Sequence, residues 1–114
     1  MVTGYASALA VTLAVEAVAY GVGLPRVGAV RRRAEAVAAG LVVNLVSHPV
    51  AWFALWPVLR WAVGRGAAFV AAEALVCVGE WATLARWRQF DRPLLLALVL
   101  AANAASLLAG AVVA

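Results

Sequence analysis

The chain has 114 residues, of which 68% are hydrophobic and 12% are charged, and its mean hydropathy is +1.02. Soluble proteins contain about 45–50% apolar and about 25% charged residues, so this composition disfavours an ordinary soluble enzyme and predicts an integral membrane protein. The net charge of +4 includes nine basic residues, all arginine, which lie in short loops between the apolar runs and form no stripe with interleaved aromatic residues. This arrangement is not that of a nucleic-acid-binding surface.

Four apolar runs, each of about 20 residues or more, predict four membrane-spanning helices. In chain order they are expected at residues 3–24, 34–59, 66–85 and 93–113. Gly23-Leu24-Pro25 is expected to close the first helix and Gly64-Arg65-Gly66 to form the turn into the third, while Pro93 suits the first turn of the fourth. The predicted fold class is therefore an all-α integral membrane protein, a four-transmembrane-helix bundle that forms a single membrane domain over residues 1–114.

Polar residues recur in the same order in the two halves of the chain. In each half a glutamate precedes a basic loop, and an asparagine follows the last arginine of that loop by 11 residues, with a serine three residues further on. The first set is Glu16, Asn44 and Ser47, and the second is Glu80, Asn103 and Ser106. We interpret the chain as two tandem helical hairpins, at about 3–59 and 66–113, although Glu73 is nearly as good a counterpart of Glu16.

The depth of these groups follows from their distance to the loop arginines. Asn44 and Asn103 are each about 16 Å along a helix from an arginine, which places them near the middle of a bilayer. We expect both to face the bundle interior at equivalent depths, close to Glu16 and to Glu73 or Glu80. Glu80 is only six residues from Arg86, so it is expected nearer the boundary, charged and hydrated.

Helical spacing brings several polar groups onto common faces. Asn44, Ser47 and His48 share one stripe of the second helix, and Glu73 and Glu80 share one stripe of the third. Pro49 removes an amide donor and predicts a local break beside His48. The predicted ligand, ion or proton site consists of the polar side chains of these stripes and their repeats: Glu16, Asn44, Ser47, His48, Glu73, Glu80, Asn103 and Ser106. No catalytic residue is predicted.

Arginine counts predict the orientation of the chain in a membrane. Seven arginines lie around residues 25–33 and 86–92, against two around residues 60–65, so the first two loops are expected in the cytoplasm and both termini outside. The predicted location is the plasma membrane of a prokaryote, with the lipid bilayer and a homo-oligomer or a larger membrane complex as partners.

The repeated pattern resembles a group of small, uncharacterised prokaryotic four-helix membrane proteins. These proteins carry acidic residues in the odd helices and Asn-x-x-Ser or Asn-x-x-Thr in the even ones, here Asn44-Leu45-Val46-Ser47 and Asn103-Ala104-Ala105-Ser106. The resemblance implies no activity. Glu16 also resembles the glutamate in the first helix of small multidrug resistance transporters, but the helix-3 glycine, tryptophan and tyrosine pattern of that family is missing. Residues 40–47 faintly resemble a segment in the second helix of small fluoride channels, but this chain lacks the phenylalanine-rich segment of that family.

Three classes of function fit these residues. The first is proton- or cation-linked transport or channel activity, with Glu16, Glu73 and His48 as exchanging groups and Asn44 and Asn103 as oriented ligands. The second is a non-catalytic subunit or assembly factor of a larger membrane complex. The third is a membrane metal or haem binder that uses Glu16, Glu73 and His48, although no particular metal or cofactor is indicated. A mid-bilayer carboxyl without a cationic partner is expected to be protonated at neutral pH, and Glu16 is the residue to which this applies best.

Overall fold

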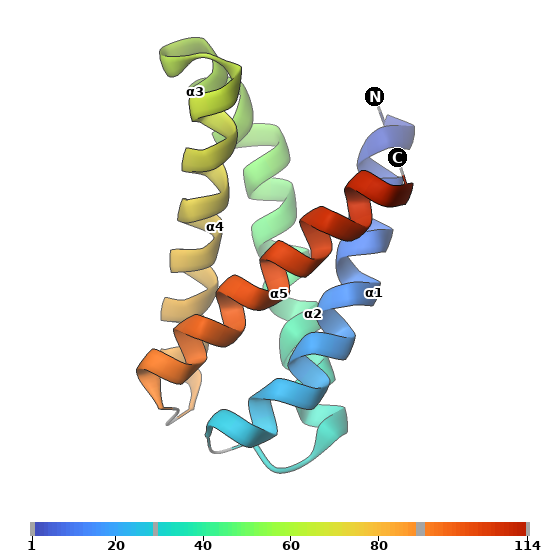
Figure 1. The fold of residues 1–114 in the computed structure, drawn as a ribbon, viewed down its shortest axis with the longest axis vertical. Helices are drawn as coiled ribbons and strands as arrows, with labels where there is room; N and C mark the ends of the chain where they lie inside the picture. The colour runs from blue at the N-terminus through green and yellow to red at the C-terminus, as the bar shows by residue number, and fades with distance from the viewer. Residues whose placement is uncertain (1, 29, 89–90, 114) are drawn as a thin grey trace.

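Helices make up nearly all of the computed structural model, which describes residues 2–28, 30–88 and 91–113 (Figure 1). The elements are α1 (Val2–Val27), α2 (Arg33–Val50), the π-helix η1 (Ala51–Leu55), α3 (Trp56–Val63), α4 (Arg65–Trp87) and α5 (Arg92–Val113). Because α2, η1 and α3 follow one another without a break, they form one span, and the described residues contain four helices long and apolar enough to cross a membrane. The all-helical prediction is confirmed.

The packing of these helices produces a bundle. Helix α1 packs along α2 and α5, and α4 packs against α5, α2 and α3. Helix α5 runs obliquely across the bundle, from the end of α4 to the start of α1 (Figure 1). The buried apolar core lies mainly where α1, α2, α4 and α5 meet, and it includes Tyr20, Leu24, Val43, Leu84 and Val99.

The ends of the helices follow local sequence signals. Gly64 has a φ of +86°, a backbone conformation that favours glycine, and it separates α3 from α4 as predicted. Asp91 begins α5: its Oδ1 accepts a hydrogen bond from the Leu94 amide at 3.2 Å. The Asp91 amide in turn donates to the Val27 carbonyl at 2.8 Å, which fastens the start of α5 to the end of α1.

The prediction that Pro25 closes the first helix is wrong. Helix α1 continues through Pro25 to Val27. A proline removes its own amide hydrogen bond and its ring crowds the carbonyl four residues back, and here both effects fall in the last turn of the helix. Leu24 is fully buried in the core, so packing holds this final turn in place.

The break predicted beside Pro49 takes the form of a π-helix. Pro49 lies inside α2 and cannot donate to the Leu45 carbonyl, and the five residues from Ala51 form η1 directly after it. At the end of η1 the Trp56 amide donates to the Ala51 carbonyl, five residues back, which is the hydrogen bond of a π-helix. The wider turn keeps the span continuous between Pro49 and Pro57.

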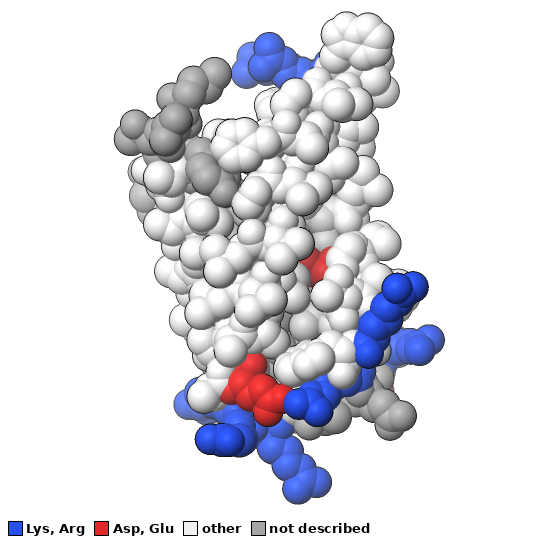
Figure 2. Space-filling view, turned by 180° about the vertical axis from the view of Figure 1, so that it is seen from behind, with Lys and Arg blue, Asp and Glu red and all other residues white. Residues whose placement is uncertain are grey.

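On the face that Figure 2 shows, the arginine side chains lie toward the two ends of the bundle, and the surface between them is uncharged apart from a small acidic spot. The loops after α1 and α4 share one end, while the Gly64 turn, the start of α1 and the end of α5 share the other (Figure 1). An ion pair between Arg88 and Glu35 links the two loops. Seven arginines therefore lie at the end formed by these two loops and two lie at the other end, as the predicted orientation requires.

Gly40 permits a close contact between α1 and α2. A Cβ atom at this position would lie 2.7 Å from Cδ2 and 2.9 Å from Cβ of Tyr20, whereas a Cβ on Gly79 would meet nothing within 4 Å. We expect Gly40→Ala to lower the free energy of unfolding by about 1–3 kcal/mol, because the Tyr20 Cβ cannot move without shifting the backbone. Gly79→Ala is the matched control, and its expected effect is a gain of up to about 1 kcal/mol. Reversible unfolding in mixed micelles measures both, and equal stabilities of the two variants would contradict the close contact.

Candidate functional site

Glu16 lies in the centre of the bundle, on α1, with a side chain that is completely buried. Its Oε1 accepts a hydrogen bond from Nδ2 of Asn44 on α2 at 3.2 Å, and its Oε2 lies 3.2 Å from the Ser106 hydroxyl on α5. The carboxyl group therefore contacts polar groups from two other helices. The Asn44 amide also donates to the Gly40 carbonyl at 2.9 Å, which fixes its orientation.

Glu80 occupies the corresponding place on α4 and is 1% exposed. Its Oε2 accepts hydrogen bonds from Nδ2 of Asn103 at 2.8 Å and from the Tyr20 hydroxyl at 2.9 Å. Its Oε1 accepts a third from the Ser47 hydroxyl at 3.1 Å. Like Asn44, Asn103 also donates to the carbonyl four residues back, that of Val99, at 2.8 Å.

The two carboxyl groups are connected in a crossed pattern. Each glutamate bonds the asparagine of its own hairpin and the serine of the other: Glu16 with Asn44 and Ser106, Glu80 with Asn103 and Ser47. We call these six side chains, together with Tyr20, the carboxyl network. The predicted burial of both asparagines close to a glutamate is confirmed, since they are 2% and 6% exposed and each contacts a glutamate. The pattern also selects Glu80, rather than Glu73, as the counterpart of Glu16.

The prediction that Glu80 is hydrated is wrong, because its side chain is shielded from solvent. The reason given for expecting a charge on it is therefore absent. Six residues separate it from Arg86 along the chain, but that spacing measures depth along one helix only. Tyr20, Ser47 and Asn103, from three other helices, surround the carboxyl group.

Two predicted site residues lie outside the carboxyl network. Glu73 is half-buried on α4, and within the described part of the chain no side-chain hydrogen bond joins it to the network. His48 is half-buried beside Ser47, and its ring stacks on Trp52 with a centroid distance of 6.1 Å. The hydrogen bonds at Glu16 come from Asn44 and Ser106, so His48 does not take the place beside Glu16 that its spacing allowed.

Sequence reasoning missed Tyr20, which makes the two halves of the network unequal. Tyr20 follows Glu16 by four residues, and the same offset from Glu80 reaches Leu84. Only Glu80 therefore gains a phenolic donor, and the space for the ring is provided by Gly40. Two signals could have revealed it: a tyrosine on the glutamate stripe of an apolar helix, and the tendency of buried tyrosine hydroxyls to find partners.

Tyr20→Phe tests this contact. Removing the hydroxyl leaves Glu80 one donor short, and the expected loss is about 1–2 kcal/mol of unfolding free energy. Thr83→Val is the matched control, because its hydroxyl is exposed and donates only to the Gly79 carbonyl, four residues back in α4; the expected change is within about 0.5 kcal/mol. Similar losses in both variants, measured by unfolding in mixed micelles, would show that Tyr20 contributes through packing alone.

The geometry at Ser106 accommodates a proton on Glu16. The Ser106 oxygen lies 3.0 Å from the Asn103 carbonyl and 3.2 Å from Oε2 of Glu16, yet a serine hydroxyl has one hydrogen to donate. When that hydrogen goes to the Asn103 carbonyl, the Ser106 oxygen is left to accept a hydrogen bond from a protonated Glu16. Both contacts are then satisfied, in agreement with the expected neutral state of this carboxyl.

The charge balance of the carboxyl network is unusual for a buried site. Among residues 2–28, 30–88 and 91–113, the one ion pair is that of Arg88 with Glu35 at the loop end, and neither buried glutamate has a basic partner. The same residues contain no group of three or more His, Cys, Asp or Glu side chains placed to hold a metal ion. Carboxyl, amide and hydroxyl groups can bind a proton or a monovalent cation, and they include none of the imidazole or thiolate ligands that haem iron and structural zinc use most often.

Fold and site together define an all-helical bundle of four membrane-length helices around a crossed network of two carboxyl groups. Compared with known protein families, with curated proteins and with solved structures, the chain matches none of them.

Proposed function

We propose that the chain is a small multi-pass membrane protein that transports or conducts protons or monovalent cations, with Glu16 and Glu80 as the exchanging groups. The observation that supports this proposal is the pair of buried carboxyl groups that have no basic partner among the described residues. A carboxyl group in hydrocarbon is costly by several kcal/mol unless it is neutralised, and such residues commonly mark ion or proton pathways. Neutral donors from three of the four spans, on α1, α2 and α5, hold the two groups in place, so a proton or cation can supply the missing positive charge.

The experiment that tests the proposal is ion flux in proteoliposomes. The purified protein is reconstituted with a pH-sensitive dye inside, and a membrane potential is imposed in the presence of protons alone, Na⁺ or K⁺. The proposal expects a flux of protons, reported by the dye, or of Na⁺ or K⁺ that is well above the flux in protein-free liposomes. Flux at the protein-free level under every condition would refute it and favour a subunit or assembly factor, which purification from membranes in mild detergent would reveal through its partners.

The proposed location is the plasma membrane of a prokaryote, with the arginine-rich end in the cytoplasm. Two single-cysteine variants test the orientation in a Cys77→Ala background: Arg31→Cys at the arginine-rich end and Arg65→Cys at the other, both at exposed positions. Residue 31 is preferred over its neighbour Val30, which is buried. A membrane-impermeant maleimide added to intact cells is expected to label residue 65 and not residue 31. The reverse pattern would invert the proposed topology.

A further inference from the structure

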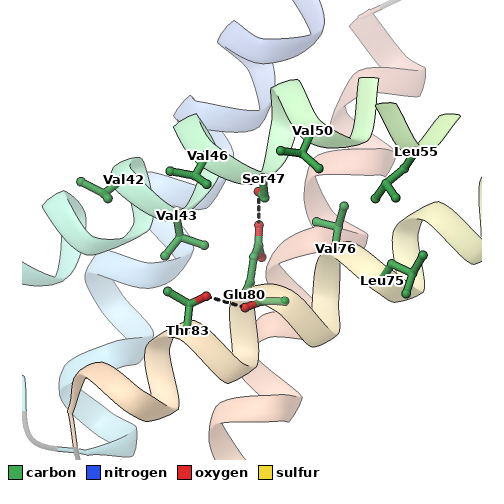
Figure 3. Close-up of a pocket in the computed structure, with 11 residues that line it drawn as sticks. Val42, Val43, Val46, Ser47, Val50, Leu55, Leu75, Val76, Glu80 and Thr83 are labelled. Carbon is green, nitrogen blue, oxygen red and sulfur yellow. Dashed lines mark hydrogen bonds between the residues drawn. The ribbon is translucent and has the colours of Figure 1, made fainter. Parts of the chain in front are cut away.

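A groove with a volume of about 260 Å³ lies between α2 and α4, at the level of Glu80 (Figure 3). Aliphatic side chains from both helices form its walls: Val42, Val43, Val46, Val50, Leu75 and Val76. Gly79 widens it, because no atom lies within 4 Å of the place where a Cβ would be. The groove thus offers an apolar space that reaches the carboxyl network from the side of the bundle.

The polar side chains of the groove are few, and Glu80 is the acidic one among them. Thr83 also lines it, but its hydroxyl donates to the Gly79 carbonyl at 2.7 Å. Ser47 and Glu80 remain, joined by the hydrogen bond of 3.1 Å between the serine hydroxyl and Oε1 (Figure 3). This serine is the outermost of the three donors to Glu80, since it alone is half-buried while Tyr20 and Asn103 are buried.

A cationic donor can replace Ser47 at Oε1 with a gain in hydrogen-bond strength. Charge-assisted hydrogen bonds are roughly twice as strong as those between neutral groups, and the serine side chain reorients by one rotation about χ1. The carboxyl would keep its bonds from Tyr20 and Asn103 at Oε2. The new charge would also balance a network that has no basic side chain among the described residues.

We propose that this groove binds a small lipophilic monocation, an organic ammonium ion whose head meets Oε1 of Glu80 and whose apolar body lies against the valines. This inference rests on the proposed function and names a substrate class for it. The Glu80 carboxyl group favours a ligand with a cationic head, and the apolar walls of the groove favour a ligand with a hydrophobic body. The volume lies just below the range of about 300–1,000 Å³ that holds drug-sized ligands, which corresponds to a body of about one ring.

The test compares two probes of the same shape, benzylammonium and benzyl alcohol, on the full-length protein in lipid nanodiscs. Binding is measured by saturation-transfer NMR, with empty nanodiscs as the reference for partition into lipid. We expect the protein to bind benzylammonium about 10- to 100-fold more tightly than benzyl alcohol, the factor that a hydrogen bond to a charged group provides. Glu80→Gln is expected to reduce benzylammonium binding to the level of the alcohol.

A second pair of variants keeps Glu80 and fills the groove. Gly79→Leu places four carbon atoms in the open space and is expected to abolish binding of both probes. Gly66→Leu is the matched control on the same helix: it also has open space around it but does not line the groove, and its binding is expected to equal that of wild type.

Three results would overturn the inference: no binding of benzylammonium above empty nanodiscs, equal affinity for the two probes, or binding that survives Gly79→Leu. Its failure is distinguishable from that of the proposed function. Proton or alkali-ion flux without benzylammonium binding would reject the groove as a ligand site and leave transport standing. Specific binding without flux of any ion, including the probe, would keep the site and reject transport.

Discussion

Glu16→Gln is expected to reduce proton or cation flux by about 100-fold or more while the protein assembles normally, since proton-transferring groups typically contribute at least that factor. Glutamine reproduces the neutral acid: its oxygen accepts from Asn44, and its amide donates to Ser106 as a protonated carboxyl would. It cannot release a proton or hold a cation by charge. The variant therefore separates the chemical role of the carboxyl from its structural role.

The measurement is the initial flux rate in proteoliposomes from about pH 5 to about pH 8, the range in which a proton-linked step is examined. Glu35→Gln serves as the matched control, because Glu35 pairs with Arg88 at the loop end and lies outside the carboxyl network. A Glu16→Gln protein that behaves like wild type across this range would mean that Glu16 is a structural hydrogen-bond acceptor. Transport would then lose its central residue, and the subunit interpretation would become the better one.

The second large effect concerns stability, and a double-mutant cycle on Glu16 and Asn44 reveals it. Asn44→Leu leaves Oε1 of Glu16 without its donor in the core, and Glu16→Leu leaves the Asn44 amide with the Gly40 carbonyl but without its side-chain acceptor. Each is expected to cost about 1–3 kcal/mol of unfolding free energy. The double variant is expected to cost less than the sum by about 0.5–3 kcal/mol, because two leucines leave neither partner unsatisfied.

A control cycle combines Asn44→Leu with Thr83→Val, which lies in α4 and shares no hydrogen bond with Asn44. These two changes are expected to add within about 0.5 kcal/mol. Unfolding of the reconstituted protein measures both cycles. Full additivity of Glu16→Leu and Asn44→Leu would show that the 3.2 Å contact does not couple the two side chains.

The sequence predicted the helices and the burial of both asparagines because those features depend on local information. The length of an apolar run determines whether a helix can span a membrane, and a spacing of three residues places Asn44 and Ser47 on one stripe. Which glutamate each of them contacts depends on how the hairpins pack, and no spacing along one helix contains that information. The same reason explains why Glu73 and Glu80, seven residues apart on one stripe, could not be ranked.

The remaining errors have similar physical origins. Counting residues to Arg86 gave the depth of Glu80 along α4 but not its burial by α1, α2 and α5. Pro25 indicates a helix end by local sequence alone, whereas the burial of Leu24 in the core, which depends on packing between helices, holds α1 helical through to Val27. Tyr20 was overlooked because its acceptor lies 60 residues away in the sequence.

The crossed pattern has a consequence for how the chain is made. During synthesis the first hairpin emerges with Glu16 and Asn44 already on neighbouring helices, so this carboxyl has one partner from the start. Helix α5 arrives last and brings Asn103 and Ser106 together, one for each glutamate. Insertion of the final span thus completes both halves of the site in a single step. Until then each carboxyl group lacks the partner that α5 provides, and an unfinished chain exposes to the membrane-insertion and quality-control machinery polar groups that the finished bundle conceals.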